Sequence, residues 1–477
     1  MSHGPARIDF RANTQQVPPG MPAAVHKATT RFLTGRAALV EILGQELWQQ
    51  LRQAGHDLRL HTLMHLDHYL ERAERAMTRA GGHVHWARDA AEARRIVLDI
   101  AEQHQVRRVV KSKSMVTEEI GLNQAMEAAG IRVVETDLGE YIVQLAGVGP
   151  AHIVVPAFHL SKEEIAALFR EKLGVDAAAE AQQLCQIARQ TLREEFLAAD
   201  MGISGGNFLV AETGTIVMVT NEGNGRMVTT VPPLHVAVVG IDKVVPDWES
   251  LTVLLKLLAR SATGQKLSCY TSFISGAPRT GAETGPWELH LVLLDNGRSR
   301  ILQSPECRET LLCIRCGACL NICPVYNTVG GYAYGWPISG PTGAILAPQI
   351  LGAQVAGALP FASTLCGACN EICPVKIPIT EILLHLRHRV AEGDAQEGPV
   401  APAMLRAGAR VGAVGLRTPW LYRLGSRLLK RVQTRFLRDG WLPNLPRPLN
   451  RWTMARPLPA FAADFREWWR SRTPEHR

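Results

Sequence analysis

Cys313-Ile-Arg-Cys316-Gly-Ala-Cys319-Leu-Asn-Ile-Cys323-Pro324 is the stretch of sequence that constrains the fold most strongly. Its spacing, C-x2-C-x2-C-x3-C-P, is typical of bacterial ferredoxins, in which cysteine thiolates hold [4Fe–4S] clusters. Three cysteines placed two residues apart can surround one cubane. Gly317 lets the backbone approach the cluster and donate N–H groups to its sulfides. In two-cluster ferredoxins the fourth cysteine of such a run ligates the other cluster.

A second stretch, Cys366-Gly-Ala-Cys369-Asn-Glu-Ile-Cys373-Pro374, repeats the first but carries Ser363 where the leading cysteine would stand. Eight of the ten cysteines lie between residues 307 and 373, so the two stretches form an internal repeat. The ferredoxin pattern then predicts crossed ligation. One [4Fe–4S] cluster would use Cys313, Cys316, Cys319 and Cys373, and a second cluster would use Cys323, Cys366 and Cys369.

The second predicted cluster is one thiolate short. The fourth position could be filled by Ser363, Cys307, a partner residue or water, or the cluster could be a three-iron [3Fe–4S] form. Zinc ribbons are the alternative interpretation of CxxC pairs, but zinc sites rarely use a repeated triple-cysteine run followed by proline. Cys185 and Cys269 stand in apolar contexts and are predicted to be buried thiols.

The chain before the cysteines alternates between strand and helix patterns. Residues 1–75 look helical and polar, and the histidines at 61, 65 and 68 are interpreted as a solvated helix face. Predicted strands at 83–86, 107–111, 131–136 and 152–156 alternate with predicted helices at 89–105, 117–130 and 161–173. A long helix over 176–200 and further strands at 207–213, 215–220, 235–240 and 288–295 follow, with a helix at 247–262. This alternation predicts a layered α/β domain with a parallel sheet and mixed character in its second half.

Polar loops in this α/β region are candidate binding sites. Lys111 and Lys113 follow a strand and precede a helix, where backbone N–H groups attract anions. Glu212 lies in a predicted strand-to-strand turn, and Arg226 lies in the loop 221–226. Ordinary turn chemistry explains the same residue types. Neither G-x-G-x-x-G after a strand nor G-x4-G-K-[ST] occurs, so nucleotide sites of those kinds are not supported.

The composition indicates a globular chain with a charged tail. Its 477 residues are 46% apolar and 20% charged, which suggests about two to four domains. Residues 401–477 carry a net charge of +12, against −4 for the preceding 400 residues. Neither a secretory signal nor an apolar run long enough to span a bilayer is evident, so a cytoplasmic protein is expected. The basic stretch 426–441 could form a helix that contacts anionic lipid, an acidic partner or its own domain, and no motif supports nucleic-acid binding.

Long stretches of the sequence resemble the lactate utilization protein B family, the iron–sulfur subunit of an L-lactate oxidation system. The likeness covers about residues 30–400 and is carried by VKSKSMVTEEIGLN (110–123), VVETDLGEYIVQLAG (133–147), GGNFLVAETGTIVMVTNEGN (205–224), LLARSATGQKL (257–267), ELHLVLLDNGRS (288–299) and both cysteine motifs. The resemblance implies a lactate-utilization (LUD) domain of the NagB/RpiA/CoA-transferase-like type. A helical two-cluster ferredoxin-like module and a basic tail would follow it. The absence of a leading cysteine from the second motif is then a family trait.

The expected organisation is a helical region at 1–75, a LUD domain at 76–300, a two-cluster module at 301–395 and a basic region at 396–477. The resemblance implies that the chain carries electrons while L-lactate is oxidised to pyruvate. It would act with a cysteine-rich subunit and a second LUD-domain subunit, at the inner face of the membrane if the basic tail binds lipid. Two alternatives remain. The LUD domain could itself bind a carboxylate and be catalytic, with Lys111, Lys113, Glu212 and Arg226 as candidates, or the chain could be an iron–sulfur redox sensor.

Overall fold

The computed structural model describes residues 7–149, 152–157, 159–277, 285–394 and 397–443, together with 445, 450, 453, 456–460 and 469–471. Within it the chain forms two compact units, Met1–Val400 and Ala401–Arg477. The first unit contains the α/β region and both cysteine stretches, and the second unit is the basic tail. Each is described by itself.

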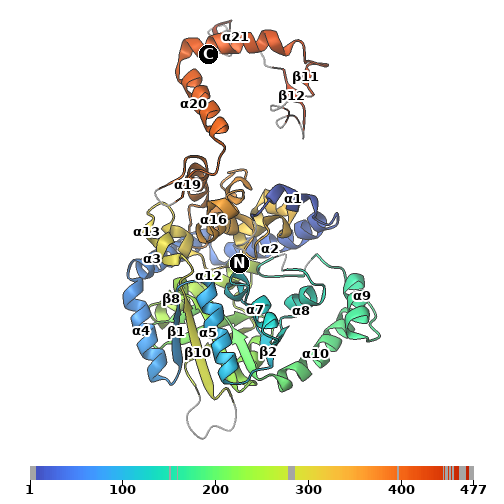
Figure 1. The fold of residues 1–477 in the computed structure, drawn as a ribbon, viewed down its shortest axis with the longest axis vertical. Helices are drawn as coiled ribbons and strands as arrows, with labels where there is room; N and C mark the ends of the chain where they lie inside the picture. The colour runs from blue at the N-terminus through green and yellow to red at the C-terminus, as the bar shows by residue number, and fades with distance from the viewer. Residues whose placement is uncertain are drawn as a thin grey trace. The chain divides into compact units, whose positions relative to one another are not determined.

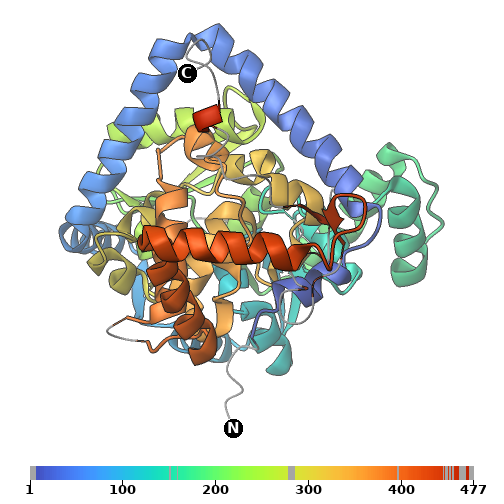
Figure 2. The same cartoon turned by 90° about the horizontal axis from the view of Figure 1, so that it is seen from above.

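Four helices open the first unit: α1 (Phe10–Gln15), α2 (Met21–Leu43), α3 (Gln45–Met64) and α4 (Leu66–Arg79). The long helices α2 and α3 meet at an angle, seen as two sides of a triangle in Figure 2. Gly44 makes this corner because its φ of +84° is a conformation that residues with a side chain rarely adopt. The predicted helical character of this region is confirmed. These helices do not form a hydrophobic core of their own, because Val25 and Trp48 are buried in the same core as the cysteines.

A six-stranded parallel sheet forms the centre of the α/β region, in the order β1-β10-β7-β4-β2-β3 (Figure 1). Its strands are β1 (His83–Ala87), β2 (Arg108–Lys111), β3 (Arg132–Glu135), β4 (Met201–Ser204), β7 (Leu234–Gly240) and β10 (Glu288–Leu294). Because successive side chains of a strand point to opposite faces, both sides of this sheet must be covered. The predicted layered α/β architecture is therefore confirmed.

The two faces of the sheet are covered by different elements. Val236 and Val238 of β7 pack in the cluster of buried side chains that includes α5 (Ala90–Gln103), α6 (Met115–Glu119) and α7 (Leu122–Ala128). The alternate residues, Ala237 and Val239, pack with α4 and a second sheet. At the β2–β3 end, α8 (Leu138–Leu145) and α10 (Ala181–Ala198) share a further apolar cluster with Val110 and Val134.

The second sheet has the order β8-β5-β6-β9 and mixed strand directions. Its strands are β5 (Phe208–Val210), β6 (Thr215–Thr220), β8 (Val244–Val245) and β9 (Tyr270–Ile274). The predicted turn at Gly214 is confirmed, with a φ of +68°. The connecting helices are α9 (Lys162–Leu173), α11 (Asn224–Thr230), η1 (Ile241–Lys243) and α12 (Trp248–Thr263). Ser161 and Glu164 form a capping box at the start of α9.

Two local predictions were wrong. Residues 152–156 do not form a strand, because the Nδ1 atom of His152 accepts the backbone N–H groups of Val154 and Val155 and curls the chain. The helix expected over 117–130 is two short helices, α6 and α7. Gly121 separates them in the left-handed conformation.

The prediction that Cys185 and Cys269 are buried was also wrong, since both are exposed. On α10 the buried stripe runs through Leu184, Ala188 and Leu192, and Cys185 lies beside it rather than on it. Cys269 directly precedes β9, which lies at the edge of the second sheet.

The cysteine stretches lie in a helical module that completes the first unit. Its elements are α13 (Arg298–Gln303), η2 (Arg308–Leu312), α14 (Ala318–Ile322), α15 (Pro324–Val329), η3 (Tyr332–Tyr334), α16 (Gly340–Leu351), α17 (Ala353–Ala356), η4 (Leu359–Phe361), α18 (Ala368–Ile372) and α19 (Ile379–Glu392). Its apolar core is continuous with side chains of α2, α3 and α12, so this module and the α/β region are packed as one body.

The second unit contains α20 (Ala403–Arg417), α21 (Pro419–Gln433) and the short strands β11 (Trp441–Leu442) and β12 (Leu458–Pro459). The helix expected over 426–441 thus ends at Gln433. Apolar residues of α21, among them Trp420 and Leu428, are exposed beside its cations. Among the helices that the structure describes, none has the length and apolar character needed to cross a bilayer.

Substitution of Gly202 tests the packing of the central sheet. A Cβ atom added there would lie 2.0 Å from the carbonyl oxygen of Val228 in α11. Because that oxygen belongs to the backbone, Gly202→Ala is expected to lower the free energy of unfolding by about 3 kcal/mol or more. Chemical denaturation followed by circular dichroism measures this loss. Gly223→Ala, where nothing lies within 4 Å of the added atom, is the matched control and should leave stability nearly unchanged.

Candidate iron–sulfur site and its surroundings

The two cysteine stretches adopt the same backbone conformation. In the first, Arg315 has a φ of +60° and Gly317 a φ of +77°; in the second, Leu365 and Gly367 have φ values of +56° and +81°. Each glycine begins a five-residue helix, α14 or α18, and each helix ends at a cysteine in extended conformation. The repeat predicted from the sequence is therefore also a repeat in structure, and α14 packs against α18.

Cys313, Cys316, Cys319 and Cys373 line one cavity, although Cys373 belongs to the other stretch. The remaining lining is mostly apolar and includes Ile314, Val375, Ile377 and Ile379, and its polar members are Thr342 and Arg315. The structure thus brings together the four side chains that crossed ligation predicts for the first cluster. Thiols converging on an enclosed apolar cavity fit an iron–sulfur cluster, whose ligands are thiolates.

Backbone N–H groups and cations are directed at these sulfur atoms. The Sγ atom of Cys313 accepts the N–H of Arg315 at 3.4 Å, and the Sγ atom of Cys373 accepts the N–H of Ile377 at 3.4 Å. Burial raises the pKa of Cys373 to about 11. Burial alone would also raise the pKa of Cys313, but the charges of Arg315 and Lys243 lower it below its ordinary value. The site therefore stabilises the thiolate form of Cys313 relative to an ordinary cysteine.

Further arginines lie around the same cavity. Arg52 donates its Nε–H to the carbonyl of Cys373 at 3.0 Å, and Arg36 donates to the carbonyl of Ile372 at 3.3 Å. Burial lowers the pKa of Arg36, and the neighbouring Cys316 and Cys373 partly oppose that shift. These arginines come from α2 and α3, so the N-terminal helices supply positive charge to the cysteine site. Such charge stabilises an anionic cluster.

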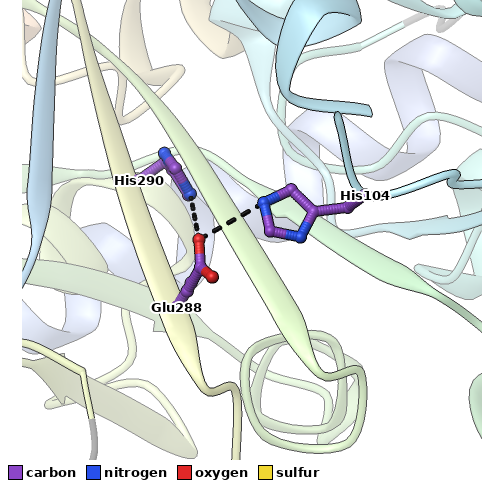
Figure 3. Close-up of side chains that lie close together, drawn as sticks. All are labelled: His104, Glu288 and His290. Atoms are coloured by element: carbon purple, nitrogen blue, oxygen red, sulfur yellow. Dashed lines mark hydrogen bonds and ion pairs between the residues drawn. The ribbon is translucent and has the colours of Figure 1, made fainter. Parts of the chain in front are cut away.

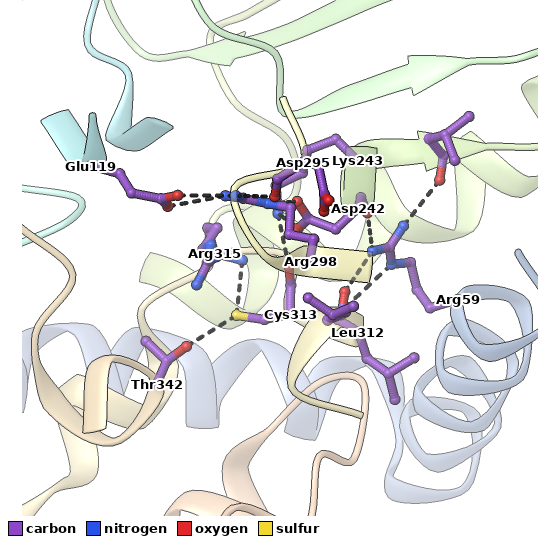
Figure 4. A network of polar contacts seen from close by, with 12 residues as sticks. Arg59, Glu119, Asp242, Lys243, Asp295, Arg298, Leu312, Cys313, Arg315 and Thr342 are labelled. Carbon is purple, nitrogen blue, oxygen red and sulfur yellow. Dashed lines mark hydrogen bonds and ion pairs between the residues drawn. The ribbon is translucent and has the colours of Figure 1, made fainter. Parts of the chain in front are cut away.

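A buried ion-pair network joins the cysteine loop to the central sheet (Figure 4). Asp242, directly after β7, pairs with Arg298 at 2.6 Å and with Lys243 at 2.8 Å. Arg298 also makes two hydrogen bonds, of 2.9 and 3.0 Å, to Glu119. Lys243 in turn donates to the carbonyl of Cys313 at 3.1 Å.

Arg59 extends the network without pairing with a carboxylate. Its guanidinium donates to the carbonyls of Leu311 at 2.8 Å and Val244 at 3.0 Å, and also to those of Leu312 and Asp242. It therefore bridges the backbone before Cys313 to the backbone after β7. The position of the cysteine loop is in this way tied to the sheet.

Cys323, Cys366 and Cys369 form the second group. Burial raises the pKa of Cys369 to about 12, and the nearby Cys323 and Cys366 add to the rise. Cys366 is exposed, and hydrogen bonds from the N–H of Ala368 and the hydroxyl of Thr364 lower its pKa. The second group therefore reaches the protein surface at Cys366, whereas the most accessible cysteine of the first group, Cys313, is only partly exposed.

Ser363 and Cys307 were the two residues of this chain that could replace the missing thiolate. Among the described contacts, neither residue contacts the sulfur atoms of these three cysteines. The hydroxyl of Ser363 accepts the N–H of Leu365 at 3.1 Å. Cys307 is fully buried beside Ser304, Glu306 and Arg389, and burial raises its pKa. This environment is that of a packed thiol between α13 and α19.

Of the candidate residues in the α/β region, Lys111 already has its positive charge paired with two carboxylates. It is fully buried at the end of β2 and pairs with Glu135 at 2.7 Å and Glu118 at 2.9 Å. Burial alone would lower the pKa of Lys111, but the two carboxylates raise it above its ordinary value. Lys111 is thus a structural part of the sheet edge.

Lys113 has a different environment, which the sequence did not reveal in full. It donates to the carbonyl of Val154 at 2.9 Å and lies 3.7 Å from the carboxylate of Glu140. Burial raises the pKa of Glu140 to about 8. Burial also raises the pKa of Tyr332 to about 12, and the proximity of Glu140 adds to the rise. Lys113 and Glu140 therefore form a polar group at the carboxyl edge of the sheet, and Tyr332 lies near it with its hydroxyl 3.0 Å from Nε2 of His159.

The segment 152–155 separates this polar group from the first cysteine loop. A side chain at Gly317 would lie 3.2 Å from Val154 and 3.5 Å from His152, and His152 lies 3.3 Å from the amide oxygen of Asn321. Sequence reasoning missed Glu140 and Tyr332. The rule that ligands bind at the carboxyl ends of parallel strands could have found Glu140, because it follows β3.

Glu212 and Arg226 do not join this group through any described contact. Glu212 is exposed in the turn between β5 and β6, and Gly214 of the same turn lies against Met77, near the start of β1. Arg226 is exposed on α11, and the loop predicted there becomes helical from Asn224. Asn224 donates to Thr136 at 3.3 Å, which places this helix near β3.

Comparison with family models divides the first unit in two. A LUD domain model matches residues 70–294, and a 4Fe-4S dicluster domain model matches residues 309–377. The second match contains all seven predicted ligand cysteines.

Similar curated proteins extend over nearly the whole chain. Lactate utilization protein B from Shouchella clausii is 44% identical over 457 residues, 95% of this chain and 94% of that protein. The proteins of the same name from Bacillus licheniformis and Geobacillus thermodenitrificans are 43% and 44% identical, each over 95% of this chain and 94% of their own length. A crystal structure of a DUF162 family protein from Deinococcus radiodurans matches 48% of this chain and 98% of that one, at 16% identity and a TM-score of 0.27.

Substitution of Arg298 tests the buried network. Removing the guanidinium leaves Asp242 and Glu119 buried and without this cation, so Arg298→Met is expected to cost about 3–5 kcal/mol of stability. Chemical denaturation of the purified protein measures the loss. Arg95→Ala removes an exposed i,i+4 pair with Asp99 and is the control, for which little change is expected. Equal stability of the two variants would contradict the role assigned to the network.

Proposed function

Because the chain belongs to the lactate utilization protein B family, we propose that it is the iron–sulfur electron-transfer subunit in the oxidation of L-lactate to pyruvate. The observation that carries the proposal is the cavity lined by four cysteines from two distant stretches of chain. When bound there, iron–sulfur clusters accept and release single electrons. The iron–sulfur role in lactate utilization follows from the family, and the path of the electrons is the proposed part.

In this proposal each cysteine has a defined role. One [4Fe–4S] cluster would be held by Cys313, Cys316, Cys319 and Cys373, and a second cluster by Cys323, Cys366 and Cys369. The fourth position of the second cluster would be a ligand other than cysteine, or the cluster would have three irons. The donor set fits, because the first group is enclosed, apolar and surrounded by N–H groups and cations.

The chain's own charges would favour acceptance of an electron. Four cations interact electrostatically with thiols of the first cysteine group: Arg36, Arg52, Lys243 and Arg315. Positive charge near a cluster stabilises its reduced, more negative state. Since Cys366 is exposed, the second group would be the point of exchange with a companion subunit.

Oxidation of lactate to pyruvate releases two electrons and two protons, whereas each cluster carries one electron at a time, so a companion subunit would supply the centre that takes the electron pair and passes single electrons to the clusters. We propose a cysteine-rich subunit and a second LUD-domain subunit as these partners, as the family implies. The basic tail would contact an acidic partner or an anionic membrane surface through the cations and exposed apolar residues of α21.

A second candidate function is favoured by the position of Lys113. The ammonium group of Lys113 could pair with the carboxylate of lactate or pyruvate, and Glu140, protonated at neutral pH, could donate to or accept from the substrate oxygen. Only the segment 152–155 separates this group from Gly317. In this alternative the LUD region holds the substrate beside the first cluster.

Iron content tests the main proposal. After anaerobic purification we expect about 8 iron atoms per chain for two cubanes, or about 7 if one cluster has three irons. Cys316→Ser should remove about four, and electron paramagnetic resonance of the reduced protein should lose one of two signals. The exposed Cys185→Ser is the control and should retain all the iron. Zinc in place of iron, or equal iron in Cys316→Ser and the wild type, would overturn the proposal.

Lactate-driven reduction tests the second candidate. In the complex assembled with the companion subunits, Lys113→Ala should reduce the clusters at least tenfold more slowly with unchanged iron content, because the substrate carboxylate loses its cation. Stopped-flow absorbance of the clusters measures the rate. The exposed Glu212→Ala and Arg226→Ala serve as controls and should match the wild type. A full rate in Lys113→Ala would refute the second candidate and leave the main proposal standing.

A further inference from the structure

Three side chains at the amino-terminal edge of the central sheet converge on one point (Figure 3). Glu288 is the first residue of β10, and His290 lies two residues further on, so both point to the same face of the strand. His104 follows the last turn of α5. We propose that His104, Glu288 and His290 bind a divalent transition-metal ion, and that zinc fits the donor set best.

The separations of the donor atoms fit a metal ion. The Nε2 atoms of His290 and His104 lie 3.2 and 3.3 Å from the same oxygen, Oε2 of Glu288. The three ligand atoms all lie within 4.8 Å of one another. Two donors that each lie 2.0–2.1 Å from a tetrahedral zinc ion are about 3.4 Å apart, so only small shifts are needed to admit the ion.

A second layer of histidines orients the ligands. The Nδ1 atom of His290 lies 2.9 Å from Nε2 of His85, in the neighbouring strand β1. If His290 donates its Nδ1–H there, its Nε2 lone pair points toward Glu288 and His104. His83 also stacks on the ring of His290, with 4.9 Å between the ring centroids. Metal-binding histidines usually have such a fixed tautomer, set by a hydrogen bond from the other ring nitrogen.

The donor set and the accessibility of these groups suit a metal. A neutral imidazole offers the lone pair that a metal requires. Two imidazoles and one carboxylate are ligands typical of zinc sites that keep a further position for water. Glu288 and His104 are partly exposed, with side-chain exposures of 42% and 34%, so solvent and ions can enter.

This location is separate from the cysteines. The buried network that contacts the cysteine loop lies at the opposite, carboxyl end of β10, where Asp295 and Arg298 follow the strand. Asp295 follows Glu288 by seven positions of extended chain, a length of about 23 Å. The ion would therefore bind independently of the clusters and would join the end of α5 to β10.

Metal analysis of the intact holoprotein tests the inference. Anaerobically purified protein is treated with EDTA, equilibrated with zinc chloride and desalted, and zinc and iron are then counted together by mass spectrometry. We expect one zinc per chain with the iron retained. Retained iron shows that zinc has not replaced iron at the cysteines. Calorimetric titration with zinc should show at least tenfold weaker binding in Glu288→Gln and His104→Ala.

The control is His65→Ala, which removes an exposed histidine that lies 4.7 Å from His61, measured between ring centroids. It should bind zinc as tightly as the wild type. Because Glu288 and His104 are partly exposed, their variants should fold, and circular dichroism checks this. Wild-type protein that retains its iron but takes up no zinc would overturn the inference. Equal affinity in the wild type and in Glu288→Gln would also overturn it and would indicate a solvated hydrogen-bonded group.

Discussion

The structure depends on holding several cysteine thiols close together inside an apolar core. Removed from water, neighbouring thiolates repel one another, and burial raises the pKa values of Cys316, Cys319 and Cys373. The fold compensates from two directions. Backbone N–H groups of the tight loops donate to sulfur, and cations from other elements surround the loops. The helices α2 and α3 are therefore part of the site, because they bring Arg36 and Arg52 to it.

The same requirement explains why the α/β region and the cysteine module form one body. Asp242 follows the central strand β7, and its partners Lys243 and Arg298 connect that strand to Cys313 and to Glu119. Each of these charges is buried, so each requires its partners. A displacement of the sheet relative to the cysteine loop would separate buried charges. This coupling holds the distance between the carboxyl edge of the sheet and the first cysteine group.

Much of the fold could be predicted from the sequence, because strand and helix periodicities are local properties. The cysteine spacing even predicted that Cys373 would join the first group, since a repeat with a known ligand pattern carries long-range information. The prediction of residues 152–156 was wrong because His152 binds its own backbone, and that interaction competes with strand pairing. The exposure of Cys185 depends on its angular position on α10, which its apolar neighbours obscured.

The candidate residues in the α/β region show where sequence reasoning reaches its limit. Lys111 and Lys113 are separated by one residue, yet one is neutralised by Glu118 and Glu135 while the other faces Glu140 and the segment that covers Gly317. Only the three-dimensional packing decides which of the two lysines has its charge paired with two carboxylates. Glu140 belongs to α8 and Tyr332 to η3, about 190 residues later in the chain. A site built from such distant segments leaves no local pattern, so it becomes visible only when the sheet edge and the cysteine module are seen together.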